Sequence, residues 1–447
     1  MAPGVAAELV NRTRVFCAAC RASHDAAIER LGNRIVGRVY CPAGERTVPL
    51  SSDAALFLKF RRRGRRPPLS AFPRSDGILI SLLDVTNGCN FRCPICYADA
   101  APADGARFLP VEEAVARARA ARRKGIWEVS LIGGEPTVHP ELPAMIRGIR
   151  ALGLRVTVSS NGYLFGRDPG LAARLKAAGL AKVNVQFDTF DRETHRRLRG
   201  NDAVGEKIAA CDNLLRAGVT VGTITTVTTL NLKELKRIVE FGLARAPRLS
   251  TITFDAATPE GRYELPADTI VDRESIIREL VASEAVSGLT EDHFWPTPHF
   301  PPWRMAVHPD CGAACFLRAE AGRTELVDGF VNLAALFDRM ARAPAISSRV
   351  LRTLALIWLI VGATRRGRRR DVFRAVAGTA RGDARCGLVA VYAGSFVGGR
   401  FWDEERIAGC PASYLEADGF VPPCLRYLPA RDAVMAEAEN TTRRRQS

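Results

Sequence analysis

The sequence predicts an α/β protein built on a partial, TIM-like (β/α)6 barrel, and three observations support this prediction. Between residues 77 and 300, short apolar or β-branched segments alternate with helical segments. Several of the helical segments end just before a glycine, as helices commonly do. The most unusual motifs follow directly after expected strands, where parallel barrels carry their active sites. Repeated strand–helix units favour a parallel sheet covered by helices.

Six strands and five helices are expected in this region. The strands are expected at Ile78–Val85, Trp127–Ile132, Arg155–Ser160, Lys182–Asp188, Val219–Thr226 and Ser250–Asp255. The helices are expected at Pro110–Arg123, Glu141–Leu152, Leu171–Ala178, Val204–Ala217 and Leu232–Ala244. Two cysteine-containing regions, residues 1–66 and 301–447, are expected to flank the barrel. The first contains one expected strand, Arg34–Tyr40, and ends before a break at Pro67-Pro68.

The composition excludes some classes of protein, but it does not identify a binding partner. Hydrophobic residues make up 47% of the 447 residues, which excludes a globally disordered chain. The net charge of +16 suggests nucleic acid, an anionic membrane or an acidic substrate. Basic runs at Arg61–Arg66, Arg365–Arg370 and Arg443–Arg445 fit such a partner, and they fit solvated surface equally well. The charge alone therefore selects no partner.

Cysteine usage and the N-terminus indicate the compartment. The chain has twelve cysteines, and several are separated by gaps of only two or three residues, which favours metal binding over disulfides. The first sixteen residues include Glu8, Arg12 and Arg14 and lack a continuous apolar run. We therefore expect a reducing, cytoplasmic environment.

A cysteine loop follows the first expected strand. Cys89, Cys93 and Cys96 can bring three thiolates to one iron–sulfur cube and leave one iron open. Zinc binding or chance clustering is the alternative explanation. CxxxCxxC with Tyr97 directly after it resembles the signature of the radical S-adenosylmethionine (SAM) superfamily. This resemblance implies a 4Fe–4S cluster that binds SAM at the open iron and cleaves it to a 5′-deoxyadenosyl radical.

Polar motifs after the next three expected strands are candidates for binding SAM. Gly133, Gly134 and Glu135 follow the second strand, where glycines allow close approach of a ligand and the carboxylate suits an ammonium group. Asn161 follows the third strand, and Gln186 and Asp188 end the fourth. These three side chains could bind the ribose or the methionine carboxylate, or could serve only as helix caps and backbone partners.

A closer resemblance runs through the whole chain. It rests on four segments: Cys17 to Cys20, Tyr40-Cys41-Pro42, Asn90–Ala98 and the ending from Cys410 to Cys424. These segments resemble the archaeal tetraether lipid synthase family. The resemblance implies radical carbon–carbon coupling of alkyl chains in membrane lipids, with auxiliary iron–sulfur clusters. Ala43 stands where that family usually has histidine, and its paired C-terminal cysteine appears here only as Cys410. We therefore expect a diverged substrate.

Two further sets of cysteines are metal candidates. The four thiolates of one auxiliary 4Fe–4S cluster are expected from Cys311, Cys315, Cys410 and Cys424, with Cys386 as a substitute ligand. Cys17, Cys20 and Cys41 form three quarters of a zinc knuckle or a rubredoxin-like iron site, with His24 or a distant cysteine as the fourth ligand. Cys211 lies on an expected helix and is assigned to the core.

The segment Val350–Ala363 has two interpretations. It is apolar, contains Trp358 and is flanked by arginines, which fits a helix lying in a membrane interface. It fits an ordinary buried helix equally well. At fourteen residues it is too short to span a bilayer.

These observations predict hydrogen abstraction from an alkyl or lipid substrate, leading to carbon–carbon bond formation. The expected partners are SAM, a flavodoxin-like or ferredoxin-like electron donor, and peripheral contact with the inner face of the membrane. One alternative keeps the radical chemistry and changes the substrate to a pterin, peptide or other metabolite, with methylation included. Another is a non-catalytic zinc or Fe–S protein that binds nucleic acid, but such a protein needs no SAM motif.

Overall fold

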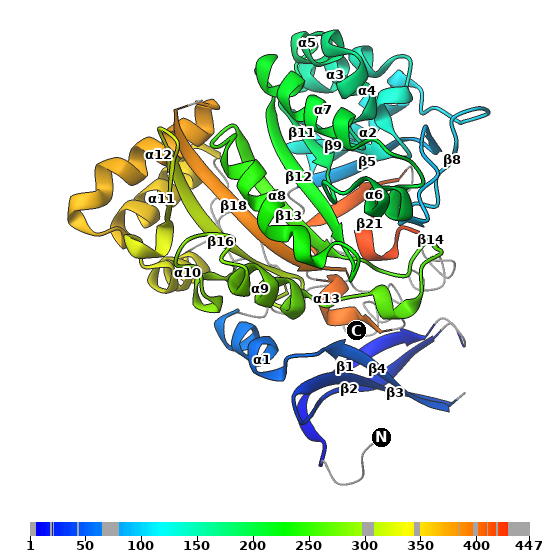
Figure 1. Cartoon of the computed structure of the whole chain (residues 1–447), viewed down its shortest axis with the longest axis vertical. Coiled ribbons are helices and arrows are strands. Elements are labelled where there is room, and N and C mark those ends of the chain that lie inside the picture. The colour runs from blue at the N-terminus through cyan, green and yellow to red at the C-terminus, as the bar shows by residue number, and fades with distance from the viewer. Residues whose placement is uncertain are drawn as a thin grey trace.

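The computed structural model describes most of the chain, and its main feature is a twelve-stranded sheet (Figure 1). The described residues are 6–17, 20, 22–42, 44–64, 80–296, 308–343, 349–383, 385–396, 401–408, 410–416 and 419–427. The break at Pro67-Pro68, the end of the first basic run and the run Arg443–Arg445 lie outside them.

The central strands of this sheet are parallel. They are, in spatial order, β20 (Ala412–Leu415), β5 (Ile80–Thr86), β9 (Glu128–Gly133), β10 (Arg155–Ser160), β11 (Lys182–Gln186), β12 (Thr220–Val227), β13 (Leu249–Ala256) and β18 (Cys386–Ser395). The six expected strands correspond to β5 and β9 to β13, which confirms the partial parallel barrel. The C-terminal region adds β20 and β18 on either side, so the parallel array is longer than expected.

Antiparallel strands border the array at both ends. β16 (Gly312–Glu320) pairs with β18, and β15 (Trp295–Pro296) and β17 (Arg323–Leu326) pair with β16. At the other end β21 (Phe420–Val421) pairs with β20. Among the described strands the two ends of this order do not pair with each other, so the sheet stays open. The region after residue 301 therefore contributes strands to the barrel sheet at both of its edges.

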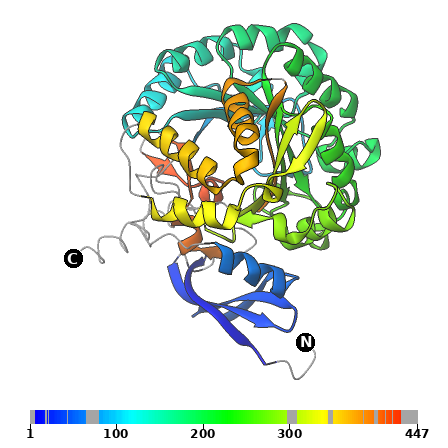
Figure 2. The ribbon, with the colours of Figure 1, turned by 90° about the vertical axis from the view of Figure 1, so that its left-hand side faces the viewer.

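Helices cover the outside of the sheet (Figure 2). They are α2 (Val111–Arg123), α3 (Leu142–Ala151), α4 (Tyr163–Arg167), α5 (Pro169–Ala177), α6 (Arg192–Arg199), α7 (Val204–Arg216), α8 (Leu235–Leu243) and α9 (Arg273–Ala282). The five expected helices are α2, α3, α5, α7 and α8. In α3 the buried residues Leu142, Met145, Ile146 and Ile149 recur at helical spacing and form one apolar stripe towards the strands.

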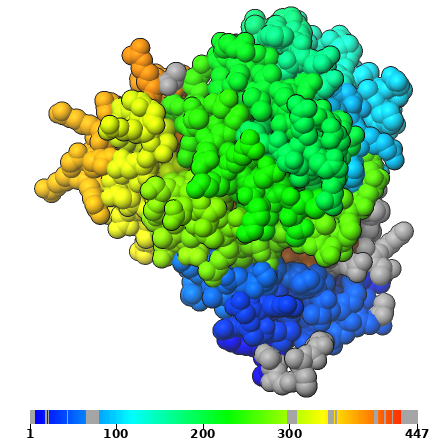
Figure 3. All heavy atoms as spheres, in the orientation of Figure 1, coloured from blue at the N-terminus to red at the C-terminus, as the bar shows by residue number. Residues whose placement is uncertain are grey.

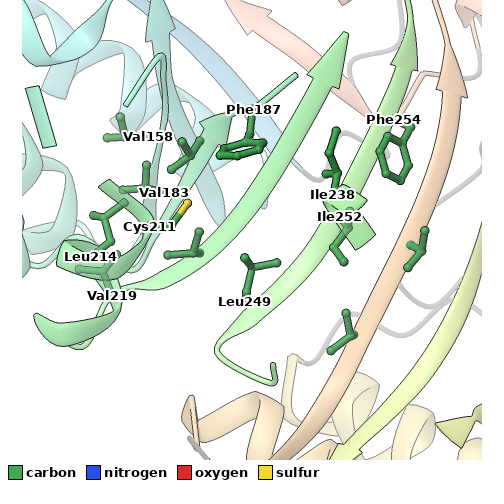
Figure 4. Close-up of a cluster of buried hydrophobic side chains, with 14 of the residues drawn as sticks. Val158, Val183, Phe187, Cys211, Leu214, Val219, Ile238, Leu249, Ile252 and Phe254 are labelled. Carbon is green, nitrogen blue, oxygen red and sulfur yellow. The ribbon is translucent and has the colours of Figure 1, made fainter. Parts of the chain in front are cut away.

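The core lies between these helices and the strands (Figure 4). Val183 and Phe187 on or beside β11 pack with side chains of the neighbouring strands and helices, and neither is exposed. Cys211 on α7 is also fully buried there, which confirms its assignment to the core. This continuous core fixes the carboxyl ends of the parallel strands, where the predicted motifs begin.

The N-terminal region forms a second sheet of five strands (Figures 1 and 3). Its strands are β1 (Glu8–Cys17), β2 (Ala22–Leu31), β3 (Arg34–Cys41) and β4 (Gly44–Ser51), with β19 (Trp402–Asp403) from the C-terminal region beside β1. Helix α1 (Ala54–Arg63) follows, and α13 (Glu404–Ala408) follows β19. Only β3 was expected, because β2 and β4 carry charged residues among their apolar ones.

Three helices form a layer at the edge of the sheet beyond β16. They are α10 (Leu333–Arg342), α11 (Arg349–Ala363) and α12 (Arg369–Arg381). Leu336 and Met340 of α10 share a small core with Leu359 of α11 and Val372 of α12. Among the described residues, no helix combines the length and the apolar character needed to cross a membrane.

Candidate active site and metal centres

The loop with the three predicted cluster cysteines begins directly after β5. Cys89 lies in β6 (Gly88–Cys89), Cys96 lies in β7 (Ile95–Cys96), and Cys93 lies between them. Short pairings fix both ends of the loop, because β6 pairs with β8 (Ala101–Pro102) and β7 pairs with β14 (Arg262–Tyr263). All three cysteines are half-buried.

The thiols of this loop stand in an environment that suits metal-bound sulfur. The Phe91 N–H donates to Cys89 Sγ at 3.3 Å, and the Ala100 N–H donates to Cys96 Sγ at 3.4 Å. Burial raises the pKa of Cys89 to about 12, and the charges of Glu135, Cys93 and Cys96 add to the rise. The raised pKa keeps the free thiol protonated, and a metal ion that binds the sulfur displaces this proton. The three residues therefore fit a 4Fe–4S cluster.

Two glycines pack the end of β9 against this loop. A Cβ on Gly133 would lie 2.3 Å from the carbonyl oxygen of Thr86, and Gly133 has a φ of +131°. A Cβ on Gly134 would lie 2.1 Å from the carbonyl oxygen of Gly88. The Gly134 N–H donates to Thr86 O and the Glu135 N–H donates to Gly88 O, both at 2.9 Å. Close approach of two backbone segments thus requires both glycines.

The carboxylate of Glu135 points into the protein. The side chain is 1% exposed, and its Oε1 accepts hydrogen bonds from Ser160 Oγ at 2.7 Å and from Thr137 Oγ1 at 2.6 Å. Oε1 also accepts the Thr137 N–H, and Oε2 accepts the Asn161 N–H at 2.7 Å. Three donors therefore converge on Oε1, whereas Oε2 receives one donor and keeps a second acceptor position. In this structure Glu135 joins the ends of β9 and β10, and its pairing with the ammonium group of SAM stays a prediction.

Asn161 and Gln186 lie next to the cysteine loop. Asn161 Nδ2 donates to Asn90 Oδ1 at 2.7 Å, and Asn161 Oδ1 accepts the Tyr163 N–H at 2.9 Å. Gln186 Oε1 accepts from Lys207 Nζ at 2.5 Å. The remaining amide groups, Asn90 Nδ2 and Gln186 Nε2, are buried without a partner in the described part of the chain. Buried donors normally have acceptors, so these two amides are the available donors for a bound group.

Asp188 is occupied by an internal ion pair. It is fully buried, and its two oxygens accept from Arg199 Nε at 2.7 Å and Arg199 Nη2 at 2.9 Å. Oδ1 also accepts the Thr226 N–H at 2.9 Å. Burial opposes ionisation, but Arg199 outweighs it and lowers the pKa of Asp188. The carboxylate is therefore engaged within the protein, and the expected role of Asp188 in binding SAM stays a prediction.

The Asp188–Arg199 pair instead supports the cysteine loop. Arg199 on α6 donates from Nη1 to the carbonyl oxygen of Ile95 at 3.1 Å and also hydrogen-bonds Cys93. A second buried cation, Lys207 on α7, donates to Asn161 O and Gln186 O, each at 2.8 Å. Burial lowers the pKa of Lys207 to about 8. Neither cation is predicted from the sequence, because a basic residue on a helix is usually solvated.

One carboxylate inside the barrel also escaped the sequence analysis. Asp255, on β13, lies beside Thr226 of β12 and Gly394 of β18. A Cβ on Gly394 would lie 2.6 Å from Asp255 Oδ1. Burial alone raises the pKa of Asp255 to about 7. Its place near the end of the last expected strand was the available signal.

The structure brings three of the C-terminal cysteines together. Cys311 precedes β16, Cys410 follows α13, and Cys424 lies in a short 3-10 helix (Pro423–Leu425). Burial raises the pKa of Cys410, and the charges of Cys424 and Cys311 raise it further. Arg406 Nε donates to Cys311 Sγ at 3.4 Å. These three half-buried thiols share one site, with Arg406 beside them.

The other two C-terminal cysteines do not join this site. Cys315 on β16 is fully buried in the barrel core, and burial raises its pKa to about 12. Four residues of strand separate it from Cys311, about 13 Å in an extended chain. Cys386 begins β18, whereas the opposite end of β18, at Ser395, hydrogen-bonds Cys311. The expected set with Cys315 as ligand and Cys386 as substitute is therefore contradicted.

Tyr97 connects this site with the cysteine loop. Its hydroxyl donates to the carbonyl oxygen of Pro423 at 2.6 Å, one residue before Cys424. Its ring stacks on Phe396 and meets Tyr427 edge to face. Tyr97 follows Cys96 directly, so the two thiol sites are joined through one tyrosine.

The N-terminal cysteines converge at the ends of β1 and β3. The sulfur atoms of Cys17, Cys20 and Cys41 all lie within 4.8 Å of one another. His24 Nε2 lies 2.7 Å from Cys20 Sγ, and Cys20 Sγ lies 3.4 Å from Cys41 Sγ. Arg46 Nη2 donates to Cys17 Sγ at 3.0 Å. Three thiols and one imidazole are a common tetrahedral zinc set, so these residues fit a metal ion.

Comparison with known proteins identifies the central part of the chain. Residues 83–242 match the model of the radical SAM superfamily. The 7,8-dihydro-6-hydroxymethylpterin dimethyltransferase of Methanocaldococcus jannaschii is 27% identical over 57% of this chain and 54% of its own length. A probable GTP 3′,8-cyclase of Saccharolobus islandicus is 33% identical over 35% of this chain and 51% of its own. The chain thus spans about half the length of these curated relatives.

Solved structures give a more distant match. Streptococcus suis SuiB bound to S-adenosylmethionine is 15% identical with a TM-score of 0.38, over 46% of this chain and 47% of that chain. The superfamily match, by contrast, encloses the cysteine loop, both glycines and strands β9 to β12. The chain therefore contains a radical SAM domain, of the superfamily that uses a 4Fe–4S cluster and SAM.

Proposed function

We propose that the chain is a radical SAM enzyme whose catalytic 4Fe–4S cluster is held by Cys89, Cys93 and Cys96. The observation that carries the proposal is the joining of this three-thiol loop to Gly133 and Gly134 at the ends of β5 and β9, within the matched domain. Three thiolates leave one iron open for SAM. When bound, the cluster supplies the electron that cleaves SAM to a 5′-deoxyadenosyl radical.

The residues around the loop hold and orient these groups. The Phe91 and Ala100 amides donate to the ligand sulfurs and stabilise them as thiolates. Arg199 anchors the loop through Ile95 O. The free amide donors of Asn90 and Gln186 are the side chains that we assign to SAM, and Asn161 orients Asn90. Glu135 joins the ends of β9 and β10, and Asp188 holds Arg199 behind the loop.

We infer that the substrate is an alkyl chain, as in a lipid, and that hydrogen abstraction leads to carbon–carbon bond formation. Support comes from the motifs shared with the tetraether lipid synthase family, including the N-terminal and C-terminal cysteines. The reaction also needs a one-electron donor of flavodoxin or ferredoxin type. A second candidate function is modification of a pterin or another small metabolite. The names of the two curated relatives favour this candidate.

Deuterium transfer separates the two candidates. The reconstituted protein is incubated anaerobically with SAM, a reductant and either a perdeuterated dialkyl glycerophospholipid or a deuterated pterin. We expect reductive SAM cleavage in every sample and deuterium in 5′-deoxyadenosine only with the lipid. Deuterium from the pterin alone would replace the lipid proposal, and no SAM cleavage under any condition would refute the radical SAM activity.

We further propose an auxiliary iron–sulfur cluster at Cys311, Cys410 and Cys424. The proximity of Cys410 to the other two thiols and the Tyr97–Pro423 hydrogen bond, which links this site to the radical SAM loop, support it. Iron content in a Cys89→Ala/Cys93→Ala/Cys96→Ala variant tests it. About four irons should remain. Their loss would remove the auxiliary cluster from the proposal.

The N-terminal site is proposed to hold a structural zinc or iron ion through Cys17, Cys20, Cys41 and His24. The short sulfur–sulfur and sulfur–nitrogen distances support it. Metal analysis of the purified protein should find one zinc, or one mononuclear iron, that survives dialysis against a weak chelator. A protein with only cluster iron would contradict the proposal.

A further inference from the structure

Helix α11 exposes one apolar face while it buries another. Leu359 is 6% exposed and packs into the small core shared with α10 and α12. On other positions of the same helix, Leu351 is 56% exposed, Leu354 is 55% exposed and Trp358 is 72% exposed. Steps of three and four residues place these three side chains in one stripe. One face of α11 is thus packed against the protein and another face is exposed. The sequence had left a buried helix and a helix at a membrane interface as alternatives, and α11 has a feature of each.

Helix α12 extends this surface and makes it strongly positive. Phe373 on α12 is 54% exposed. The exposed residues Arg365, Arg366, Arg369 and Arg370 stand at the turn between the helices and in the first turn of α12. None of these four forms an ion pair within the described part of the chain, whereas Arg368 and Arg374 are paired with acidic residues. In Figure 3 the yellow and orange side chains of this region project from the left edge of the molecule.

We propose that α11 and α12 form a docking surface for an anionic lipid bilayer. Exposed Trp and Leu side chains beside unpaired arginines are the combination that enters the interface between headgroups and acyl chains. The fifteen residues of α11 extend about 22 Å, less than the roughly 30 Å of a hydrocarbon core. The helix therefore lies on the bilayer and does not cross it.

The charges favour a bilayer over a second copy of the chain. A two-fold dimer through this surface would bring the same unpaired arginines of both copies together, and like charges repel. An anionic bilayer offers the opposite charge and an apolar layer in one partner. The proposal does not depend on the catalytic function, because all of its residues lie outside the cysteine loop.

Vesicle flotation of the full-length protein tests the surface. The vesicles contain either phosphatidylcholine alone or phosphatidylcholine with 30 mol% phosphatidylglycerol, a composition of about one anionic lipid in three. We expect flotation with the anionic vesicles at low salt and release as salt is raised. Each arginine near the surface should strengthen partitioning about fivefold, so Arg366→Glu/Arg369→Glu should weaken it about 25-fold or more. Leu354→Ser/Trp358→Ser should abolish flotation even at low salt.

Matched variants on other faces control for net charge and for exposed apolar area. Arg119→Glu/Arg123→Glu reverses two exposed arginines on α2, which lies on the right-hand side in Figure 1, across the molecule from α11 and α12. Leu9→Ser removes a leucine that is 51% exposed on β1. Both controls should float like the wild type. Thermal unfolding and gel filtration of every variant exclude misfolding, which is not expected at side chains this exposed.

Three outcomes would overturn the proposal. If the α2 variant loses as much binding as the α12 variant, diffuse net charge and not this surface attracts the bilayer. If the wild type does not float and Leu354→Ser/Trp358→Ser converts a dimer to a monomer in gel filtration, the exposed stripe is an interface between copies. Absence of both flotation and self-association also refutes a docking role for a bilayer.

Discussion

The N-terminal metal site and the cysteine loop of the barrel use the same residue type in opposite ways. At the N-terminus three sulfur atoms lie within 4.8 Å of one another, and His24 beside Cys20 is the proposed fourth ligand. In the barrel, Cys89, Cys93 and Cys96 come from one loop at the strand ends, and the described residues supply no fourth ligand in that loop. A closed set of four suits a structural ion, and an open set of three suits a catalytic one.

The surroundings of the two sites differ as much as the ligands. Behind the barrel loop lie the buried groups Glu135, Asp188, Arg199 and Lys207, each with several partners. The N-terminal site is near the surface, with Cys20 exposed and Arg46 as the nearby cation. The comparison teaches that the barrel site depends on buried electrostatics, whereas the N-terminal site depends chiefly on its ligands. The following predictions test this difference.

The largest effect is expected from replacing all three loop cysteines. Cys89→Ala/Cys93→Ala/Cys96→Ala should remove about four irons per chain and all formation of 5′-deoxyadenosine, because no other thiolates hold that cluster. The N-terminal metal should remain at full occupancy, because its ligands belong to another sheet. Metal analysis and chromatography of the SAM products measure both. Residual SAM cleavage would contradict the assignment of the loop.

Breaking the buried ion pair should cost the most stability. Asp188→Asn leaves the guanidinium of Arg199 buried without its carboxylate, and such a loss costs about 3–5 kcal/mol. Denaturant unfolding of the metal-free protein measures it. Asp168→Asn is the matched control, because Asp168 is an exposed helix cap that Asn replaces well. Equal effects of the two variants would show that the pair does not support the barrel.

Removal of the Glu135 charge should weaken the joint between β9 and β10. Glu135→Gln keeps the size of the side chain but turns one acceptor into a donor that faces other donors. We expect a loss of about 1.5–3 kcal/mol in the free energy of unfolding, without SAM present. Unchanged stability together with weaker SAM binding would return Glu135 to the role of a ligand for SAM.

Asp255 should make stability depend on pH in the opposite sense to a salt-bridged carboxylate. Its folded pKa is raised from 3.8 to about 7, so the folded state holds a proton that the unfolded state releases. The contribution of Asp255 to the free energy of unfolding is fully present below pH 4 and is lost as the pH rises towards 7. Asp255→Asn should therefore stabilise the metal-free protein by a few kcal/mol at pH 8 and have little effect at pH 4. Thermal unfolding at both values checks the sign, and destabilisation at pH 8 would contradict it.

The smallest effect is expected beside the N-terminal site. Arg46→Met removes the hydrogen bond to Cys17 Sγ and keeps all four ligands. Loss of such an outer partner typically weakens metal binding about tenfold or more. Competition with a chromogenic chelator measures this affinity. A complete loss of metal would mean that this site, too, depends on its electrostatic surroundings, and the contrast between the two sites would disappear.

The sequence was sufficient for the parts of the fold that have a local signature. Strands such as Arg155–Ser160 coincide with β10, because β-branched residues between turns form strands with little help. Strands β2 and β4 were missed, because charged residues interrupt their apolar pattern. β20 was missed as well, because its four residues carry too little pattern. Their pairing depends on neighbours that are distant in sequence.

By itself the sequence determined the cysteine loop, the glycines after β9 and the parallel strand–helix order, because spacing along the chain carries this information. Only the tertiary structure decided where each side chain points. It engaged Glu135 and Asp188 with partners inside the protein, buried Arg199 and Lys207 beneath the loop and separated Cys315 from Cys311. The physical reason is that a polar side chain takes the nearest buried partner, and the fold brings that partner from another part of the chain.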